Sequence, residues 1–164
     1  MDSFGPMLKV IAFTLQEVSS HNSLLQNNDI GLTRFHTLIP PKISILSYLQ
    51  YIYQKNFCED SDFIIAFILL DRLIKQQNQI CITPNTVHKL FLCSLMTASK
   101  FTTDTSIRNS FWAQIGGLNV EELNLLELDF LFLLHFSLSV SPDEFHKYDD
   151  VLRNKSKLIP FTNL

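Results

Sequence analysis

Two charged side chains lie within strongly apolar stretches of the sequence and offer hydrogen-bonding chemistry to a partner. Lys100 lies near the end of the stretch 90–101, and Glu127 lies between Leu126 and Leu128. The lysine ammonium is a hydrogen-bond donor, and the carboxylate is an acceptor. A charge in apolar surroundings needs a partner, either inside the fold or on another protein.

Helical spacing places Glu127 within or beside a row of apolar residues. Leu123 and Leu131 lie four residues before and after it, and Phe130 lies three residues after it. These side chains therefore share one face of a helix. Three explanations for Glu127 and Lys100 are open at this stage. Each side chain reaches solvent from the edge of the core, the two form an internal ion pair, or both contact another protein.

The elements that must position these charges are predicted to be helices. Apolar residues recur at three- and four-residue steps along most of the chain. The expected helices span 4–20, 44–55, 61–76, 83–101, 107–115, 119–136 and 141–153. The chain has only 4 Gly against 14 Phe, which favours long helices with short connections over a strand-rich fold. The segment 63–70 is apolar on every side, so its helix should lie at the centre of the domain.

Local signals mark several of the expected helix ends. Ser61 is an expected N-cap, and Thr83 stands before a proline that suits the first helical position. The glycine pair 116–117 can adopt the left-handed conformation that ends a helix. Asn119 and Ser141 are each followed three residues later by glutamate, which approximates a capping box.

Length and composition indicate one globular domain. The chain has 164 residues, of which 46% are hydrophobic and 18% are charged, so it can bury a core and is not of a disordered type. We expect an N-terminal helix and loop at 1–36, a core of helices at 37–140, and a C-terminal helix and tail at 141–164.

Several classes of function are disfavoured by the sequence. The net charge is −3 and no basic stripe is present, which argues against nucleic-acid binding. The longest apolar run, 63–70, is far shorter than the ~20 residues of a membrane-spanning helix. The three cysteines, Cys58, Cys81 and Cys93, are widely spaced and suggest neither a zinc site nor a disulfide framework.

Enzyme motifs are absent as well. The sequence contains neither a phosphate-binding glycine loop nor an H-E-x-x-H pattern. We therefore expect no catalytic residue, no cofactor, no metal ion and no small-molecule substrate. The first residues carry no basic leader of a secretory signal, so we expect an intracellular protein of the nucleus, the cytoplasm or both.

An ordered set of motifs resembles the cyclin box. The similarity is greatest to the single-box P/U-type cyclins, a group that includes the phosphate-signalling cyclins of yeast and the U-type cyclins of plants. The matching segments are 43–45, 48–49, 70–73, 85–88, 98–101, 116–117, 122–124 and 142–148. The resemblance implies an all-α domain with about five core helices, a cyclin box at 37–140, and flanking N- and C-terminal helices.

The resemblance also implies a non-catalytic subunit that binds and activates a cyclin-dependent serine/threonine protein kinase. In the family, a lysine at the end of the third box helix and a glutamate early in the fifth bind main-chain groups beside the C-helix of the kinase. Lys100 and Glu127 match these two residues. Phe101 and Asp104 complete the expected kinase-binding set. Asp104 would pair with an arginine of the activation segment, or it is simply a turn residue.

The sequence departs from the family at two points. Tyr51 occupies a place where the group usually has a basic residue, and the Met-Arg-Ala-Ile-Leu motif with which mitotic cyclins dock substrates is absent. A cyclin-fold adaptor that binds proteins without activating a kinase is the alternative function. An enzyme on a helical scaffold is a more distant one.

Overall fold

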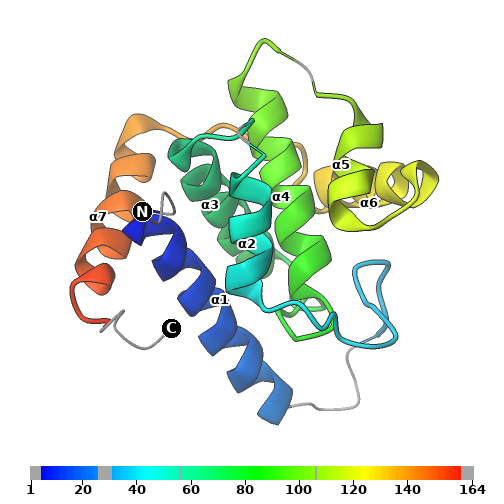
Figure 1. Cartoon of the computed structure of the whole chain (residues 1–164), viewed down its shortest axis with the longest axis horizontal. Coiled ribbons are helices and arrows are strands. Elements are labelled where there is room, and N and C mark those ends of the chain that lie inside the picture. Colours follow the sequence, from blue (N-terminus) through cyan, green and yellow to red (C-terminus); the bar gives the residue numbers. More distant parts are fainter. Residues whose placement is uncertain (1–4, 26–30, 56, 106, 160–164) are drawn as a thin grey trace.

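The computed structural model describes residues 5–25, 31–55, 57–105 and 107–159, and the regular secondary structure within these ranges is entirely helical. The all-α prediction is confirmed. The helices are α1 (Pro6–Leu24), α2 (Ile45–Tyr53), α3 (Asp60–Gln76), α4 (Val87–Thr102), α5 (Asn109–Gly116), α6 (Val120–Leu133) and α7 (Pro142–Ser156). Figure 1 shows α3 and α4 at the centre, with α1 and α7 on one side and α5 and α6 on the other.

The centre of the molecule is the contact between α3 and α4. Phe63, Ile68 and Leu69 of α3 are fully buried, and every residue of α4 from 90 to 99 is buried. The Ser94 hydroxyl donates to the main-chain oxygen of Ala66 over 2.5 Å, so the small side chain of Ala66 lets the two helices approach closely. The prediction that the 63–70 helix lies at the centre is confirmed, and α4 shares that place.

Three helices are capped by the side chain of the residue before them. Ser44, Asn119 and Ser141 each accept a hydrogen bond from the main-chain amide three residues later. The prediction that Ser61 caps α3 was wrong. Glu59 is the N-cap and forms a reciprocal capping box with Asp62, which places the first turn two residues earlier.

Other helix boundaries differ from the expected ones, because contacts to distant residues outweigh the local sequence signals. α1 continues beyond the expected end at 20 to Leu24, where the Asn22 side chain donates to the carbonyl of Ile82 over 2.9 Å. α4 begins at Val87 rather than at 84. The hydroxyl of Thr86 donates to the carbonyl of Cys81 over 2.6 Å and accepts from the amide of Thr83, which holds 83–86 in a turn.

Left-handed residues end two helices. Gly117 has φ 65° and closes α5, as the glycine pair predicted. α6 ends at Leu133 instead of 136, because His135 and Phe136 adopt φ values of 52° and 54° without the help of a glycine. The amide of Phe136 donates to the carbonyl of Leu131 over 2.9 Å, which satisfies the end of the helix.

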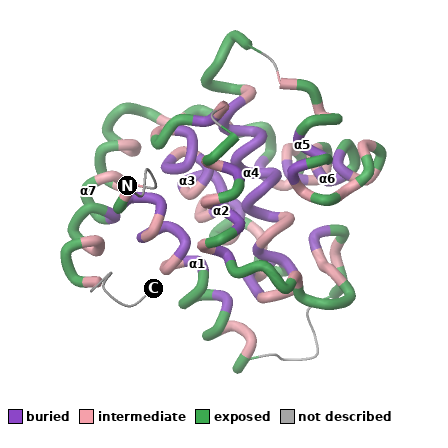
Figure 2. Tube along the Cα trace, in the orientation of Figure 1, coloured by how far each residue is buried: buried purple, intermediate pink, exposed green. Residues whose placement is uncertain are grey.

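The two outer helices belong to the same core as the box helices. Leu8, Ile11 and Leu15 of α1 and Leu152 of α7 are almost completely buried and join one hydrophobic cluster with α2, α3 and α4. Figure 2 shows this buried strip along α1. The domain boundaries at 36 and 140 stay predictions. The hydrophobic cluster extends across both of them.

The segment 70–73 fixes α7 onto α3. Arg72 donates to the carbonyls of Ser137 and Ser139 over 2.6 and 3.1 Å and forms an ion pair with Glu144 at 2.9 Å. Asp71 accepts from the hydroxyl of Tyr148 over 2.5 Å. The segment 70–73 of α3 therefore positions α7.

Within the described ranges, helix length and apolarity nowhere reach what a membrane crossing requires. In the same ranges, no three His, Cys, Asp or Glu side chains gather in a way that would hold a metal ion.

Candidate partner-binding site

Lys100 and Glu127 are brought together by the last turn of α4 and the middle of α6. The lysine Nζ lies 2.6 Å from Oε1 of Glu127, and the side chains remain 29% and 19% exposed. Of the three explanations left open by the sequence, the internal ion pair describes the structure. The pair nevertheless reaches the surface, so it stays accessible to a binding partner.

Asn109, the first residue of α5, joins the same pair. Its Oδ1 accepts from Lys100 Nζ over 2.5 Å, and its Nδ2 donates to Oε2 of Glu127 over 2.6 Å. The Nδ2 also donates to Oδ1 of Asn124 over 2.7 Å. Sequence reasoning did not select Asn109 as a site residue. The available signal was the resemblance, because the segment 109–112 keeps the asparagine of the family pattern.

The end of α4 is held in place by contacts to α3 and α5. The hydroxyl of Thr102 donates to Oδ1 of buried Asp62 over 2.8 Å, which ties the last turn of α4 to the first turn of α3. Gly116 lets α5 approach α4, because a Cβ at this position would collide with Cδ2 of Leu92. These contacts fix the positions from which Lys100 and Asn109 extend.

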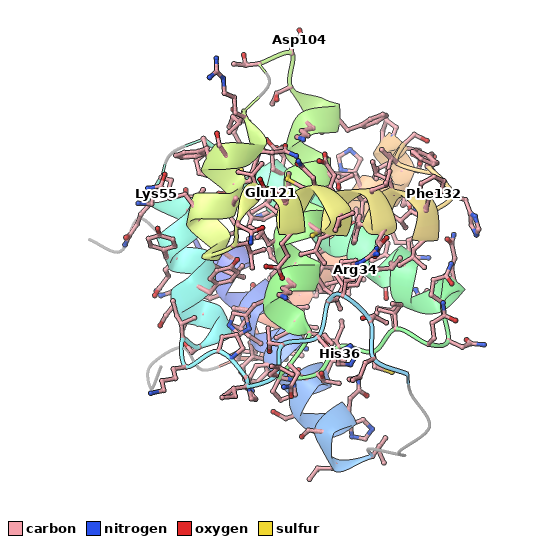
Figure 3. All side chains as sticks on the ribbon, turned by 90° about the vertical axis from the view of Figure 1, so that its right-hand side faces the viewer. Arg34, His36, Lys55, Asp104, Glu121 and Phe132 are labelled. Carbon is pink, nitrogen blue, oxygen red and sulfur yellow. The ribbon has the colours of Figure 1, made fainter. Side chains whose placement is uncertain are left out.

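The lead-in segment 31–44 supports α6 from the other side. Arg34 donates to both carboxylate oxygens of Asp129 over 2.9 Å, and buried Phe35 packs edge-on against Phe130. Thr37 and Asn85 exchange main-chain and side-chain hydrogen bonds of 2.8 Å. Figure 3 shows Arg34 directly below the helix that carries Glu127.

The other two predicted site residues lie at the surface. Phe101 is 57% exposed beside Lys100. Asp104 is exposed in the loop between α4 and α5, at the upper tip of the molecule in Figure 3. The structure thus brings together Lys100 and Glu127, leaves Phe101 next to them, and places Asp104 in a separate loop.

Exposed apolar side chains also lie along α6, the helix that carries Glu127. Leu125, Leu128 and Phe132 form a row along the outer side of α6, here called the α6 stripe, and are 46%, 47% and 59% exposed. Phe136 is 55% exposed and packs against Phe132 with ring centroids 5.2 Å apart. Figure 3 shows α6 crossing this face from Glu121 to Phe132. Clustered exposed apolar side chains are typical of a protein-binding surface.

Sequence comparisons agree with this architecture. The model of the cyclin family matches residues 12–138. The chain belongs to the cyclin family. The resemblance noted in the sequence is thereby confirmed, and with it a regulatory rather than catalytic role, as in other cyclins.

The curated relatives include plant cyclins of the U and P types. The chain is 38% identical to Cyclin-U4-1 of Arabidopsis thaliana over 93% of its own length and 79% of that protein. It is 36% identical to Cyclin-U4-2 of the same plant, covering 91% of this chain and 70% of the relative. Identity to Cyclin-P4-1 of Oryza sativa subsp. japonica is 32%, over 91% and 73% of the two chains.

Tyr51, at the position where the resemblance led us to expect a basic residue, lies on the surface of α2. Tyr51 is 38% exposed, and the ammonium of Lys55 stands over its ring, 4.6 Å from the centroid. Tyr51 therefore faces solvent rather than bracing the core.

Two of the three thiols of this cyclin, those of Cys58 and Cys93, are core groups rather than reactive ones. Burial, with a smaller contribution from the nearby Asp62 carboxylate, raises the pKa of the Cys58 thiol to about 12. Burial also raises the pKa of Cys93, which is completely buried in α4. Both thiols stay protonated near neutral pH, so they act as small apolar side chains.

Proposed function

We propose that this cyclin binds a cyclin-dependent serine/threonine kinase through Lys100, Glu127 and the adjoining α6 stripe, and that binding activates the kinase. The observation that carries the proposal is a partly open ion pair between two helices that also bear exposed apolar side chains, Phe101 on α4 and the α6 stripe. Charged hydrogen bonds at such a site give orientation, and the apolar surface around them gives affinity.

The ion pair keeps hydrogen-bonding capacity for a partner. The Lys100 ammonium donates one hydrogen bond to Glu127 and one to Asn109, and its third N–H group remains available. The Glu127 carboxylate likewise has lone pairs left after its bonds to Lys100 and Asn109. The pair can therefore accept from main-chain amides and donate to main-chain carbonyls beside the kinase C-helix, as the family resemblance implies.

Activation follows as a shift between kinase conformations. A cyclin that binds the active conformation more tightly than the inactive one draws the kinase toward the active state. Holding the C-helix inward allows the kinase's own Lys–Glu pair to form. We further propose that Asp104 binds an arginine of the activation segment, since a carboxylate accepts both arms of a guanidinium.

The contact area expected for this function sets a requirement on the surface. A stable complex buries at least ~1,200 Å² in total. Phe101 of α4 and the α6 stripe supply exposed apolar side chains on the two helices that carry the ion pair. Because cyclin-dependent kinases act inside the cell, the proposal implies an intracellular location in the nucleus, the cytoplasm or both.

The test is a double substitution of the ion pair, Lys100→Ala with Glu127→Ala. We expect kinase affinity to fall by about 100-fold, because two charges that bind kinase main-chain groups are removed. Affinity and kinase activity are measured for a panel of recombinant cyclin-dependent kinases from the source organism. The matched control is Lys155→Ala with Glu17→Ala, which removes an ion pair of 2.6 Å between α7 and α1 on another surface.

The two readouts separate the proposed function from its alternative. Wild-type affinity in a well-folded Lys100/Glu127 double variant would contradict the proposal. Kinase binding by the wild type without any rise in activity would favour the adaptor function. Unchanged binding by the Lys155/Glu17 control excludes a general effect of lost surface charge.

A further inference from the structure

We propose that Asn109 is a positioning residue of the kinase-binding site: its side-chain amide holds Lys100 and Glu127 in their binding geometry before the kinase arrives. The inference rests on the proposed kinase-binding function. It adds a third residue, from a third helix, to a site that the sequence assigned to α4 and α6. The carrying observation is that one amide contacts both charges, at 2.5 and 2.6 Å.

The chemistry of the amide suits this bridging position. An asparagine carries an acceptor oxygen and a donor nitrogen on the same carbon, so it can bind a cation and an anion together. The oxygen faces Lys100 Nζ and the nitrogen faces Glu127 Oε2. The reversed amide would place N–H groups against the ammonium and an oxygen against the carboxylate. The surrounding charges therefore select one orientation.

Asn124 fixes the second hydrogen of the same amide nitrogen. Its Oδ1 accepts from Asn109 Nδ2 over 2.7 Å at the exposed edge of the network. The Asn109 oxygen and both its amide hydrogens thus have partners. The hydrogen bond of Asn124 goes to Asn109 and not to Lys100 or Glu127, so Asn124 is a matched comparison for Asn109.

Pre-organisation gives this arrangement its effect on binding. Long charged side chains lose rotamer freedom when they enter an interface, and that loss weakens binding. Asn109 imposes part of the order in the free protein, where Lys100 and Glu127 already share one geometry. The kinase then meets two charges that are held in place and still partly exposed.

The substitution that tests the role is Asn109→Ala. Alanine is a good helix former and Asn109 is not the N-cap of α5, which is Arg108, so the helix start survives the change. We expect kinase affinity to fall about tenfold, from the freedom regained by two charged side chains. Asn124→Ala should change affinity by less than about twofold, because the bridge to both charges remains.

A double-mutant cycle distinguishes positioning from general support of the fold. In a Lys100→Ala, Glu127→Ala background, Asn109→Ala should cause no further loss of affinity, since the groups that it positions are gone. The same tenfold loss in both backgrounds would overturn the proposal, because Asn109 would then act on the kinase or the fold directly. Wild-type affinity of Asn109→Ala in the native background would also overturn it.

A measurement on the free protein keeps the test independent of the kinase. The ¹⁵N resonance of the Lys100 ammonium is assigned by its loss in Lys100→Arg. The ammonium hydrogens observed through it should be protected from solvent exchange in the wild type and in Asn124→Ala. Protection should be lost in Asn109→Ala, and retained protection would overturn the positioning role. If the Lys100/Glu127 double variant binds kinase normally while this protection still depends on Asn109, the proposed function fails and the positioning geometry stands.

Discussion

At the scale of single residues, the candidate site is a set of polar groups that are only partly satisfied by their own chain. Lys100, Glu127 and Asn109 bond to one another, yet the two charges keep 29% and 19% of their side-chain surface exposed. A pair that is already neutralised internally loses less hydration on binding than two isolated charges would. The proposed interface therefore gains orientation without burying an unpaired charge.

The stability of the folded protein should depend on pH through His88. Its Nε2 donates to the carbonyl of Ile43 over 2.9 Å, while Nδ1 is buried and has no partner among the described residues. Burial lowers the pKa of His88, and the hydrogen bond to Ile43 opposes this only in part. Folding therefore favours the neutral ring. Its stabilising effect is complete above the unfolded pKa of 6.5 and is lost as the pH falls toward the folded pKa.

We therefore expect the free energy of unfolding to fall between pH 7 and pH 5.5, and to fall less in His88→Gln. Glutamine keeps a donor for Ile43 and removes the titrating ring. Urea unfolding at several pH values measures the slope. His146→Gln, at an exposed position in α7, serves as the control and should keep the wild-type slope. An unchanged slope in His88→Gln would contradict the assignment.

The sequence predicted which residues of the site carry charge but not how they meet. Lys100 and Glu127 stood out because apolar neighbours surround them at helical spacing, and that pattern is local. Their contact depends on the approach of α4 to α6, which no local pattern encodes. The role of Asn109 was not predicted for the same reason, since a polar residue at a helix start has many ordinary explanations.

At the scale of elements, the attachment of α7 depends on Arg72 of α3. Its side chain is 16% exposed and serves two main-chain carbonyls and the Glu144 carboxylate. These contacts lie at the connection 134–141, where the main chain has just passed through two left-handed residues. Arg72 thus replaces the regular hydrogen bonds that an irregular connection lacks.

Replacement of Arg72 by alanine should destabilise the protein by about 1–3 kcal/mol, because it leaves two main-chain carbonyls and the partly buried Glu144 carboxylate without their charged donor. Thermal or urea unfolding measures the loss, and limited proteolysis should cut the connection 134–141 first. Lys75→Ala is the matched control: its 2.7 Å pair with Asp71 is largely exposed, and its removal should cost less than about 0.5 kcal/mol. Equal losses for the two variants would contradict the role of Arg72.

Elements were predicted more reliably than their ends. Each of the seven expected helices has a counterpart within the described residues, because helical periodicity repeats over many positions. The ends depend on single contacts. α6 stops early at two non-glycine residues in left-handed conformation, and Glu59 replaces Ser61 as a cap because Asp62 completes the reciprocal pair. Neither choice could be read from one residue alone.

At the scale of the whole molecule, the outer helices and the box share one hydrophobic cluster. α1 contributes Met7, Leu8, Val10, Ile11 and Leu15, all buried against α2, α3 and α7. Burying such side chains contributes about 8–15 kcal/mol, which is comparable with the total stability of a typical domain, about 5–15 kcal/mol. We therefore propose that the segments 1–36, 37–140 and 141–164 fold as one unit.

The fragment 37–140 should consequently fail to fold cooperatively on its own, although it contains the whole predicted box. Near-ultraviolet circular dichroism and urea unfolding compare the fragment with the full chain. A neighbouring pair of residues in α7 tests the same idea without truncation. Leu152 is 2% exposed and Val151 is 60% exposed. Leu152→Ala should cost about 2–4 kcal/mol, and Val151→Ala should cost less than about 0.5 kcal/mol.

These measurements decide between a shared core and an independent box. A fragment with the cooperativity and stability of the full chain would show that α1 and α7 merely lie against a self-sufficient box, and Leu152→Ala would then cost no more than Val151→Ala. Loss of folding in the fragment together with a large Leu152 effect would place α1 and α7 inside the folding unit. Their packing would then support α3 and α4, and α4 ends at the lysine that we propose meets the kinase.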